Sequence, residues 1–163
     1  MSNELVSVII PTYNRFSFLL NAIHSVIKQT YKNIEIIIVN DCSTQEEYYK
    51  YNFNKEFGDK VFIVNLPRNS RSYLGRVAGG GNSRNIGIML AKGEYIAFLD
   101  DDDIWMDQKL EIQLKTMEEK DFIFSSTEGY FGEGVYNLNE KYPLYNKEKF
   151  YKKIKSKYKG TKY

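Results

Sequence analysis

Short apolar runs, rich in β-branched residues, recur through the N-terminal part of the chain and alternate with segments of helical periodicity. Each run is only long enough for one strand and is apolar at successive positions, which is typical of strands buried on both faces of a sheet. Polar residues, Pro or Gly interrupt the chain between the runs. The pattern predicts four buried strands, at Val6–Ile10, Ile34–Val39, Val61–Leu66 and Glu94–Leu99.

The segments between these strands repeat their apolar residues every three or four positions, as helices do. Strands that alternate with helices predict an α/β fold, in which helices cover both faces of a mainly parallel central sheet as three α/β/α layers. Ligands of such folds bind beyond the carboxyl ends of the strands. The remaining predicted elements are helices at Phe16–Gln29, Gln45–Phe57, Arg84–Lys92 and Asp107–Lys120, a loop over residues 68–83, and a short strand at Phe122–Phe124.

Four consecutive aspartates, Asp100–Asp103, follow the last of the four buried strands directly. Carboxylates this close repel one another unless a counter-charge is present. A Mg²⁺ or Mn²⁺ ion would supply that charge, because hard cations prefer oxygen ligands. A solvated turn that caps the helix beginning near Asp107 explains the same residues, and the run alone does not decide between the two. The abrupt step from an apolar strand to four charges favours a metal site.

Two other polar segments follow predicted strands and are expected at the same edge of the sheet. Residues 11–15 come after the first strand, and Asp41 comes shortly after the second. The Asp41 carboxylate is either an acceptor for a base or ribose, or the N-cap of the next helix. The Tyr13 ring either stacks on a base or packs at the rim. Both alternatives stay open until the motifs are considered together.

A Gly-rich segment, residues 79–85, leads into a predicted helix. Free backbone N–H groups at a helix N-terminus bind anions, and the guanidinium of Arg84 suits a diphosphate. A mobile surface loop is the alternative. No Gly-Lys-Ser/Thr follows this segment, and no Gly-x-Gly-x-x-Gly follows the first strand. Nucleoside-triphosphatase and dinucleotide-binding folds are therefore disfavoured.

Composition argues against several other classes of protein. One cysteine cannot form a disulfide within the chain, and one histidine with one cysteine cannot build a zinc cluster. The net charge of +2 does not indicate an anionic partner. The Lys- and Tyr-rich tail, Lys152–Lys162, is interpreted as a solvated or disordered end rather than a nucleic-acid-binding site. With no signal peptide or membrane-spanning run visible, the expected location is the cytoplasm or the cytoplasmic face of a membrane.

Six segments together resemble family 2 glycosyltransferases in content, order and spacing. The resemblance depends on their combination, because each segment alone is common. It implies a Rossmann-like glycosyltransferase A-type fold, and an inverting transfer from a nucleotide-diphosphate sugar, with UDP as the expected nucleotide, to a hydroxyl acceptor. The resemblance extends over about residues 5–115, and its segments are residues 8–15, 29–31, 35–44, 83–87, 91–96 and 98–105.

The same resemblance implies roles for the polar residues at the sheet edge. Thr12, Tyr13 and Asp41 would contact the base and ribose, while Arg84 would approach the base or the diphosphate. Asp102 would bind Mn²⁺ or Mg²⁺ directly, with Asp100 and Asp101 assisting through ribose or water. The implied nucleotide-sugar-binding residues are Pro11, Thr12, Tyr13, Asn14, Arg15, Asp41, Arg84, Asp100, Asp101 and Asp102, and the implied metal ligands are Asp102 and Asp100.

The catalytic base is the functional residue that the resemblance does not assign. The family's catalytic base is a carboxylate well downstream of the acidic run, in the acceptor-binding half, which is expected to lie beyond this chain. Glu128, Glu133 and Glu140 are the candidates to substitute for it. The alternative function is therefore a nucleotide-sugar-binding module that lacks full transferase activity because its acceptor half is missing or lies on another chain. The predicted organisation is a single glycosyltransferase domain over residues 1–163, with a donor-binding half at about 5–115 and a short, incomplete acceptor part at 116–163.

Overall fold

The structure is a computed structural model that describes residues 3–75, 80–132, 137 and 139–144. The chain divides into two compact units, Met1–Ile123 and Phe124–Tyr163. The first unit contains the sheet and all of the helices described below. In the second unit, a single antiparallel bridge joins Tyr130 and Leu144. The candidate base Glu133 and the tail Lys152–Lys162 lie outside the described residues.

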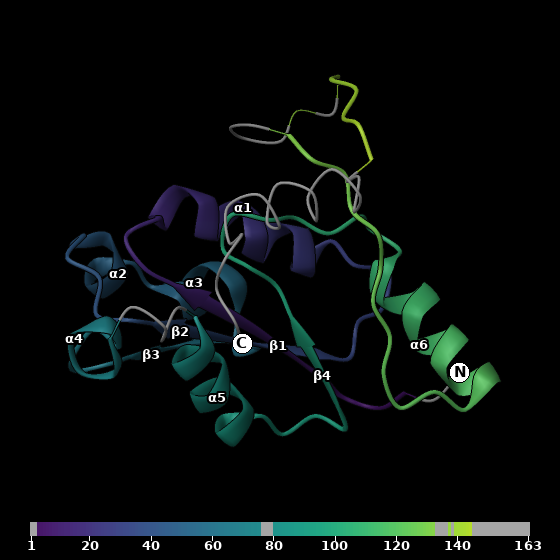
Figure 1. The fold of residues 1–163 in the computed structure, drawn as a ribbon, viewed down its shortest axis with the longest axis horizontal. Coiled ribbons are helices and arrows are strands. Elements are labelled where there is room, and N and C mark those ends of the chain that lie inside the picture. Colours follow the sequence, from purple (N-terminus) through teal and green to yellow (C-terminus); the bar gives the residue numbers. More distant parts are fainter. Residues whose placement is uncertain (1–2, 76–79, 133–136, 138, 145–163) are drawn as a thin grey trace, which may run out of the picture. The chain divides into compact units, whose positions relative to one another are not determined.

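The first unit is built on four parallel strands in the order β3-β2-β1-β4 (Figure 1). Thr12 pairs with Asn40, and Asn40 pairs with Asn65, so three neighbouring strands end at the same level. The predicted α/β fold with a parallel central sheet is confirmed. The strands are β1 Val6–Thr12, β2 Ile34–Asn40, β3 Val61–Asn65 and β4 Tyr95–Phe98.

Helices cover both faces of this sheet and create two hydrophobic cores. On one face, α1 (Phe16–Ile27), α2 (Glu47–Lys50), α3 (Phe53–Phe57) and α6 (Lys109–Lys120) bury their apolar residues. On the other face, α5 (Gly81–Leu90) packs against a smaller cluster. Figure 1 shows α1 and α5 on opposite sides of the sheet. Even-numbered residues of β1 face the larger core and Ile9 faces the smaller one, as strand alternation requires.

Burial differs between the central and the outer strands. Every residue of β1 and β2 is buried, as their continuous apolar sequences predict. The edge strand β4 instead alternates, because Ile96 and Phe98 are exposed while Tyr95 and Ala97 pack against the larger core. Strand β3 is also only partly buried. The prediction of strands buried on both faces is therefore right for the centre of the sheet and wrong for its edges.

Two predicted helical boundaries are wrong for local reasons. The single helix Gln45–Phe57 is divided into α2 and α3, because Tyr51 is extended and the Asn52 side chain accepts a hydrogen bond from the Lys55 N–H to begin a new helix. The predicted loop over 68–83 contains a further helical turn, α4 (Arg71–Leu74), and the start of α5.

The predicted strand Phe122–Phe124 is also wrong. Helix α6 ends at Lys120, and its C-cap residue, Asp121, adopts a left-handed conformation with φ of 53°. The three residues after it have no regular structure, and Ile123 is 99% exposed. Their apolar character favours a strand locally, but in the described part of the chain they form no ladder with another strand. Of the helices that the structure describes, none combines the length and apolarity needed to cross a membrane.

Close contact between α5 and β1 depends on Gly87. A Cβ at this position would lie 2.4 Å from Cγ2 of Ile9, a buried core residue. Gly93, which was predicted to stop the preceding helix, lies between α5 and β4 and also permits a close contact. A Cβ there would lie 2.6 Å from the Leu5 carbonyl oxygen. These two glycines let the helix and the following turn approach β1 directly.

We therefore expect Gly87→Ala to destabilise the protein by about 1–3 kcal/mol, the usual cost of forcing atoms into a packed core. Urea unfolding followed by circular dichroism measures the effect. The matched control is Gly81→Ala in the same helix, where an added Cβ meets nothing within 4 Å. Equal stability of the two variants would show that α5 does not pack on β1 as described.

Candidate functional site

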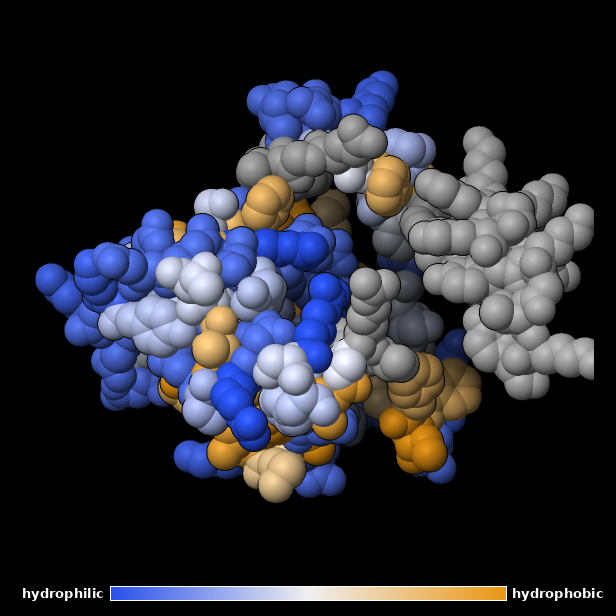
Figure 2. Space-filling view, turned by 60° about the vertical axis from the view of Figure 1, so that its left-hand side comes forward, coloured by the Kyte–Doolittle hydropathy of each residue, from blue (hydrophilic) through white to orange (hydrophobic). Residues whose placement is uncertain are grey.

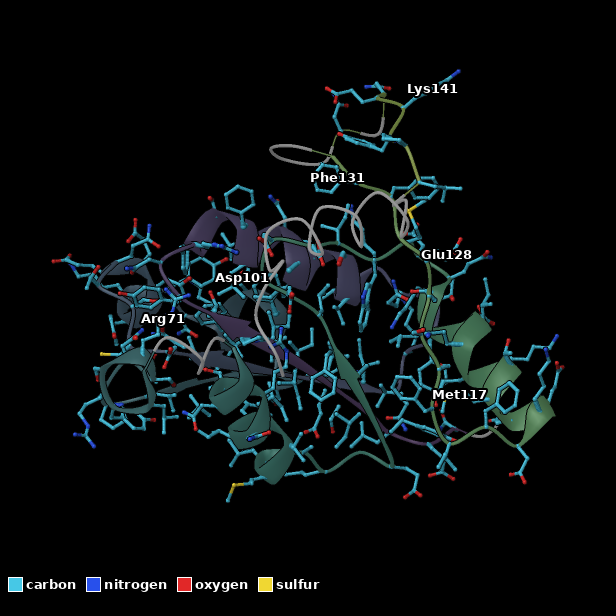
Figure 3. All side chains as sticks on the ribbon, in the orientation of Figure 1. Arg71, Asp101, Met117, Glu128, Phe131 and Lys141 are labelled. Carbon is cyan, nitrogen blue, oxygen red and sulfur yellow. The ribbon has the colours of Figure 1, made fainter. Side chains whose placement is uncertain are left out.

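The loops that follow β1, β2 and β4 meet at the carboxyl edge of the sheet. Figure 3 shows Asp101, after β4, on the same side of the sheet as Arg71 of α4. Figure 2, turned to bring this side of the molecule forward, shows a mainly hydrophilic surface with hydrophobic residues gathered toward its lower margin. The Asp41 N–H donates to the Thr12 carbonyl, and Arg15 pairs with Asp101, so the expected convergence of polar groups from separate parts of the sequence is present.

Asp101 is the buried member of the acidic run, with only 6% of its surface exposed. Its carboxylate accepts hydrogen bonds from the Thr12 hydroxyl and the Tyr13 N–H, and Oδ1 lies 3.2 Å from Nη1 of Arg15. Burial raises the pKa of Asp101, while the hydrogen bond from Thr12, the charge of Arg15 and the Tyr13 N–H oppose that rise. Asp101 thus ties the end of β4 to the end of β1.

Asp100 and Asp102 differ from Asp101 because their side chains are about half exposed. Oδ2 of Asp102 lies 2.6 Å from Nη1 of Arg15. Asp100 forms an ion pair with Arg84 of α5. Two arginines from different elements therefore supply the counter-charges that the acidic run requires, while carboxylate oxygens remain accessible to solvent.

These two exposed carboxylates fit the coordination habits of a hard divalent cation. Mg²⁺-type sites commonly use one or two carboxylates and complete their coordination with substrate phosphates. In the part of the chain that the structure describes, no three His, Cys, Asp or Glu side chains form a ready-made metal cage. Asp102 and Asp100 therefore suit a shared protein–substrate metal site, whereas the oxygens of Asp101 are committed to the protein.

The predicted binding residues 11–15 begin within β1, which extends to Thr12, and divide into structural and accessible groups. Pro11 is a buried strand residue paired with Val39. Asn14 has φ of 52°, and its Oδ1 accepts a 2.7 Å hydrogen bond from the Thr44 N–H, so it fixes the loop after β2. The Tyr13 side chain is 45% exposed and is accessible for stacking.

Asp41 is neither a helix cap nor an unoccupied acceptor. Its Oδ1 accepts hydrogen bonds from the Ser70 N–H at 2.8 Å and the Ser70 hydroxyl at 2.7 Å, and its Oδ2 accepts one from Asn69 at 3.2 Å. The N-cap of α2 is Glu46, so the N-cap interpretation of Asp41 is wrong. Asp41 instead holds the segment that leads into α4.

The same segment reaches the start of α5. The side-chain amide of Asn82 donates to the Ser70 hydroxyl at 2.9 Å and to the Tyr73 hydroxyl at 3.0 Å. Arg84, which pairs with Asp100, lies on the first turn of α5 just after Asn82. A chain of hydrogen bonds therefore connects Asp41 at the end of β2 with the helix that carries Arg84.

The partners that hold these groups are not predicted from the sequence. Asn69, Ser70 and Asn82 fall in the predicted loop, and their pairing with Asp41 or with one another spans 12 to 29 positions in the chain. Tyr48, whose hydroxyl contacts Thr12 and the Arg15 N–H, lies in a segment interpreted only as helical. No local pattern marks any of these residues, because their roles arise from long-range contacts.

Comparisons with known proteins agree on one family. The model of the family described as Glycosyl transferase family 2 matches residues 7–162. A Rickettsia bellii protein named as a glycosyltransferase is 44% identical over 122 residues, which are 75% of this chain and 16% of the relative. The Escherichia coli protein UDP-Glc:alpha-D-GlcNAc-diphosphoundecaprenol beta-1,3-glucosyltransferase WfaP is 38% identical over 127 residues, 78% of this chain and 47% of the relative. The chain thus spans less than half the length of either protein.

Solved structures agree on the fold. Staphylococcus aureus TarS, residues 1–349 in complex with UDP, superposes with a TM-score of 0.59 at 28% identity, over 70% of this chain and 32% of that one. The mannosyltransferase PcManGT of Pyrobaculum calidifontis, solved with GDP-Man and Mn²⁺, gives a TM-score of 0.62 at 20% identity, over 72% of this chain and 33% of that one. The latter likeness concerns the fold alone.

The electrostatics of the acidic run predict that Asp103→Asn stabilises the metal-free protein. Asp103 lies at the surface, but partial loss of solvent and repulsion from the other three aspartates raise its pKa above the usual 3.8. The folded state therefore holds this proton more tightly than the unfolded state, and its stability falls as pH rises from 3.8 through the folded-state pKa. The stabilisation by Asn should be complete above that pKa and should vanish as pH falls toward 3.8.

Urea unfolding in EDTA across this pH range, for wild type and Asp103→Asn, measures the difference. The matched control is Asp107→Asn, an exposed aspartate just beyond the run. A gain that is independent of pH, or one shared by the control, would contradict the electrostatic explanation.

Proposed function

Because the chain belongs to glycosyl transferase family 2, we propose that its sheet edge binds a UDP-sugar and that the protein transfers the sugar, with inversion, to a hydroxyl acceptor. The observation that carries this proposal is the pairing of Arg15 and Arg84 with the acidic run at the edge where the Tyr13 ring is exposed. That edge offers cationic groups for a diphosphate, carboxylates for a metal and an aromatic face for a base.

The choice of uridine is supported by one solved structure at 28% identity and one relative at 38% identity. TarS was solved with UDP, and the name of the Escherichia coli relative specifies UDP-Glc as donor. In this chain the base would stack on Tyr13, and Asp41 would act through the 69–70 segment that its carboxylate holds. In the same arrangement, the ribose would lie near Thr12 and the diphosphate between Arg84 and the exposed carboxylates.

A metal fits this arrangement, with Asp102 and Asp100 as its protein ligands and Mn²⁺ or Mg²⁺ as the ion. A structure of GalNAc-T7 with UDP, GalNAc and Mn²⁺ resembles this chain with a TM-score of 0.51 at 28% identity, which favours Mn²⁺ as the first ion to test. A bound cation would stabilise the negative charge that develops on the leaving diphosphate. Arg84 would donate hydrogen bonds to the same oxygens as it leaves Asp100.

Inversion also requires a base that takes the proton of the acceptor hydroxyl as it attacks the anomeric carbon. Glu128 and Glu140 are the described candidates, and both belong to the second unit. The Glu140 carboxylate accepts hydrogen bonds from Asn137 and Tyr142, and Glu128 also has an interaction partner. Substitution of each to Gln, with initial rates of sugar transfer and of donor hydrolysis measured separately, tests them as bases.

The proposed site predicts that Mn²⁺ and UDP bind cooperatively. Two exposed carboxylates form a poor octahedral cage, so diphosphate oxygens should complete it. Calorimetric titration with Mn²⁺ should give a higher affinity in the presence of UDP than in its absence. Asp102→Asn should remove most of this coupling and leave the circular dichroism spectrum unchanged.

The control for this titration is Asp107→Asn, which lies outside the acidic run and should retain wild-type coupling. Equal Mn²⁺ affinity with and without UDP in the wild type would contradict the proposed metal site. Loss of coupling in the control would show that the effect is not specific to Asp102.

A further inference from the structure

Tyr48 lies in α2, outside the six sequence motifs that carry the resemblance, and only 1% of its surface is exposed. Its hydroxyl oxygen lies 2.6 Å from Oγ1 of Thr12 and 3.0 Å from the backbone nitrogen of Arg15. The Ser43 hydroxyl also hydrogen-bonds to it. The Tyr48 hydroxyl therefore contacts the last residue of β1 and the loops that follow β1 and β2.

The Thr12 hydroxyl extends the contacts of Tyr48 to the acidic run. It hydrogen-bonds to the Tyr48 hydroxyl and to the Asp101 carboxylate. The Tyr48 oxygen also accepts a hydrogen bond from the Arg15 N–H. Hydrogen bonds therefore link Arg15 to Tyr48, Tyr48 to Thr12 and Thr12 to Asp101.

This chain of hydrogen bonds closes on itself. Arg15 donates its backbone N–H at one end, and its guanidinium meets Asp101 at the other end. The linking side chains, Tyr48, Thr12 and Asp101, are all buried. Hydrogen bonds shielded from water are electrostatically stronger and polarise one another, so a closed ring fixes its members more firmly than separate contacts do.

We propose that the Tyr48 hydroxyl is a positioning group of the donor site, which sets the places of Thr12, Arg15 and Asp101 without touching the ligand itself. This inference rests on the proposed function. By holding Asp101, the ring of hydrogen bonds also fixes the backbone from which Asp100 and Asp102 extend. Tyr48 thus connects α2 to the exposed carboxylates that would face the diphosphate and the metal.

The Tyr48→Phe substitution removes the hydroxyl and keeps the aromatic side chain. The aromatic ring of Tyr48 packs edge-on against Phe16, with centroids 5.2 Å apart, and phenylalanine keeps that contact. Tyr51→Phe is a matched control, because Tyr51 packs on Phe16 at 5.3 Å from the same part of the chain. The two variants lose the same atom from neighbouring rings, and only one of them loses the hydrogen bonds to Thr12 and Arg15.

The experiment measures UDP affinity in the presence of Mn²⁺ by calorimetry, together with thermal unfolding. A neutral hydrogen bond is worth about 0.5–1.5 kcal/mol, so we expect Tyr48→Phe to bind UDP about 2- to 10-fold more weakly, and Tyr51→Phe to bind as the wild type does. The affinity loss of Tyr48→Phe should be smaller in an Asp101→Asn background, because both changes break the same ring.

A wild type that does not bind UDP would overturn the proposed function, and this inference with it. A wild type that binds, beside a folded Tyr48→Phe variant with equal affinity and a lower melting temperature, would overturn only the positioning role. If Tyr48→Phe does not fold, incorporation of 4-aminophenylalanine at position 48 decides the question, since its amine replaces the hydroxyl as donor and acceptor. Recovery of both folding and affinity supports the inference, and recovery of folding alone overturns it.

Discussion

The site depends on one buried carboxylate, that of Asp101, and on the donors that surround it. Burying a charge is costly unless hydrogen bonds and an opposite charge compensate it. Thr12, the Tyr13 N–H and Arg15 provide that compensation, and all of them come from the end of β1. The parallel pairing of β1 with β4 brings these groups within reach. The contacts of Asp101 thus join two chain segments 86 positions apart into one rim.

This constraint explains why four identical residues in a row take different roles. Asp101 points inward and belongs to the framework, while the half-exposed Asp100 and Asp102 face arginines on opposite sides. Asp103 has a pKa raised by loss of solvent and by its three neighbours. The alternation of inward and outward carboxylates allows one short run both to hold the sheet edge and to offer oxygens to a ligand.

The second organising contact is the bonding of Asp41 to Ser70. It places the segment before α4 against the end of β2, and Asn82 extends the connection to α5. Gly87 lets α5 lie directly on Ile9, which sets the position of Arg84 relative to the sheet. Asp41 after β2 and Arg84 on α5 are therefore joined through protein contacts.

Much of this architecture is predictable from sequence, because strand burial and helical periodicity are local properties of the chain. The central strands, the parallel α/β fold and the convergence of residues 11–15, Asp41 and the acidic run all follow from them. The break between α2 and α3, the absence of a strand at Phe122–Phe124 and the exposed faces of β4 do not, since capping, ladder partners and edge position decide them. Nor does the sequence distinguish Asp101 from its neighbours or indicate Tyr48 and Ser70. Only the tertiary structure sets which carboxylate is buried and which distant donors reach it, because burial and hydrogen bonding across the chain depend on how whole elements pack.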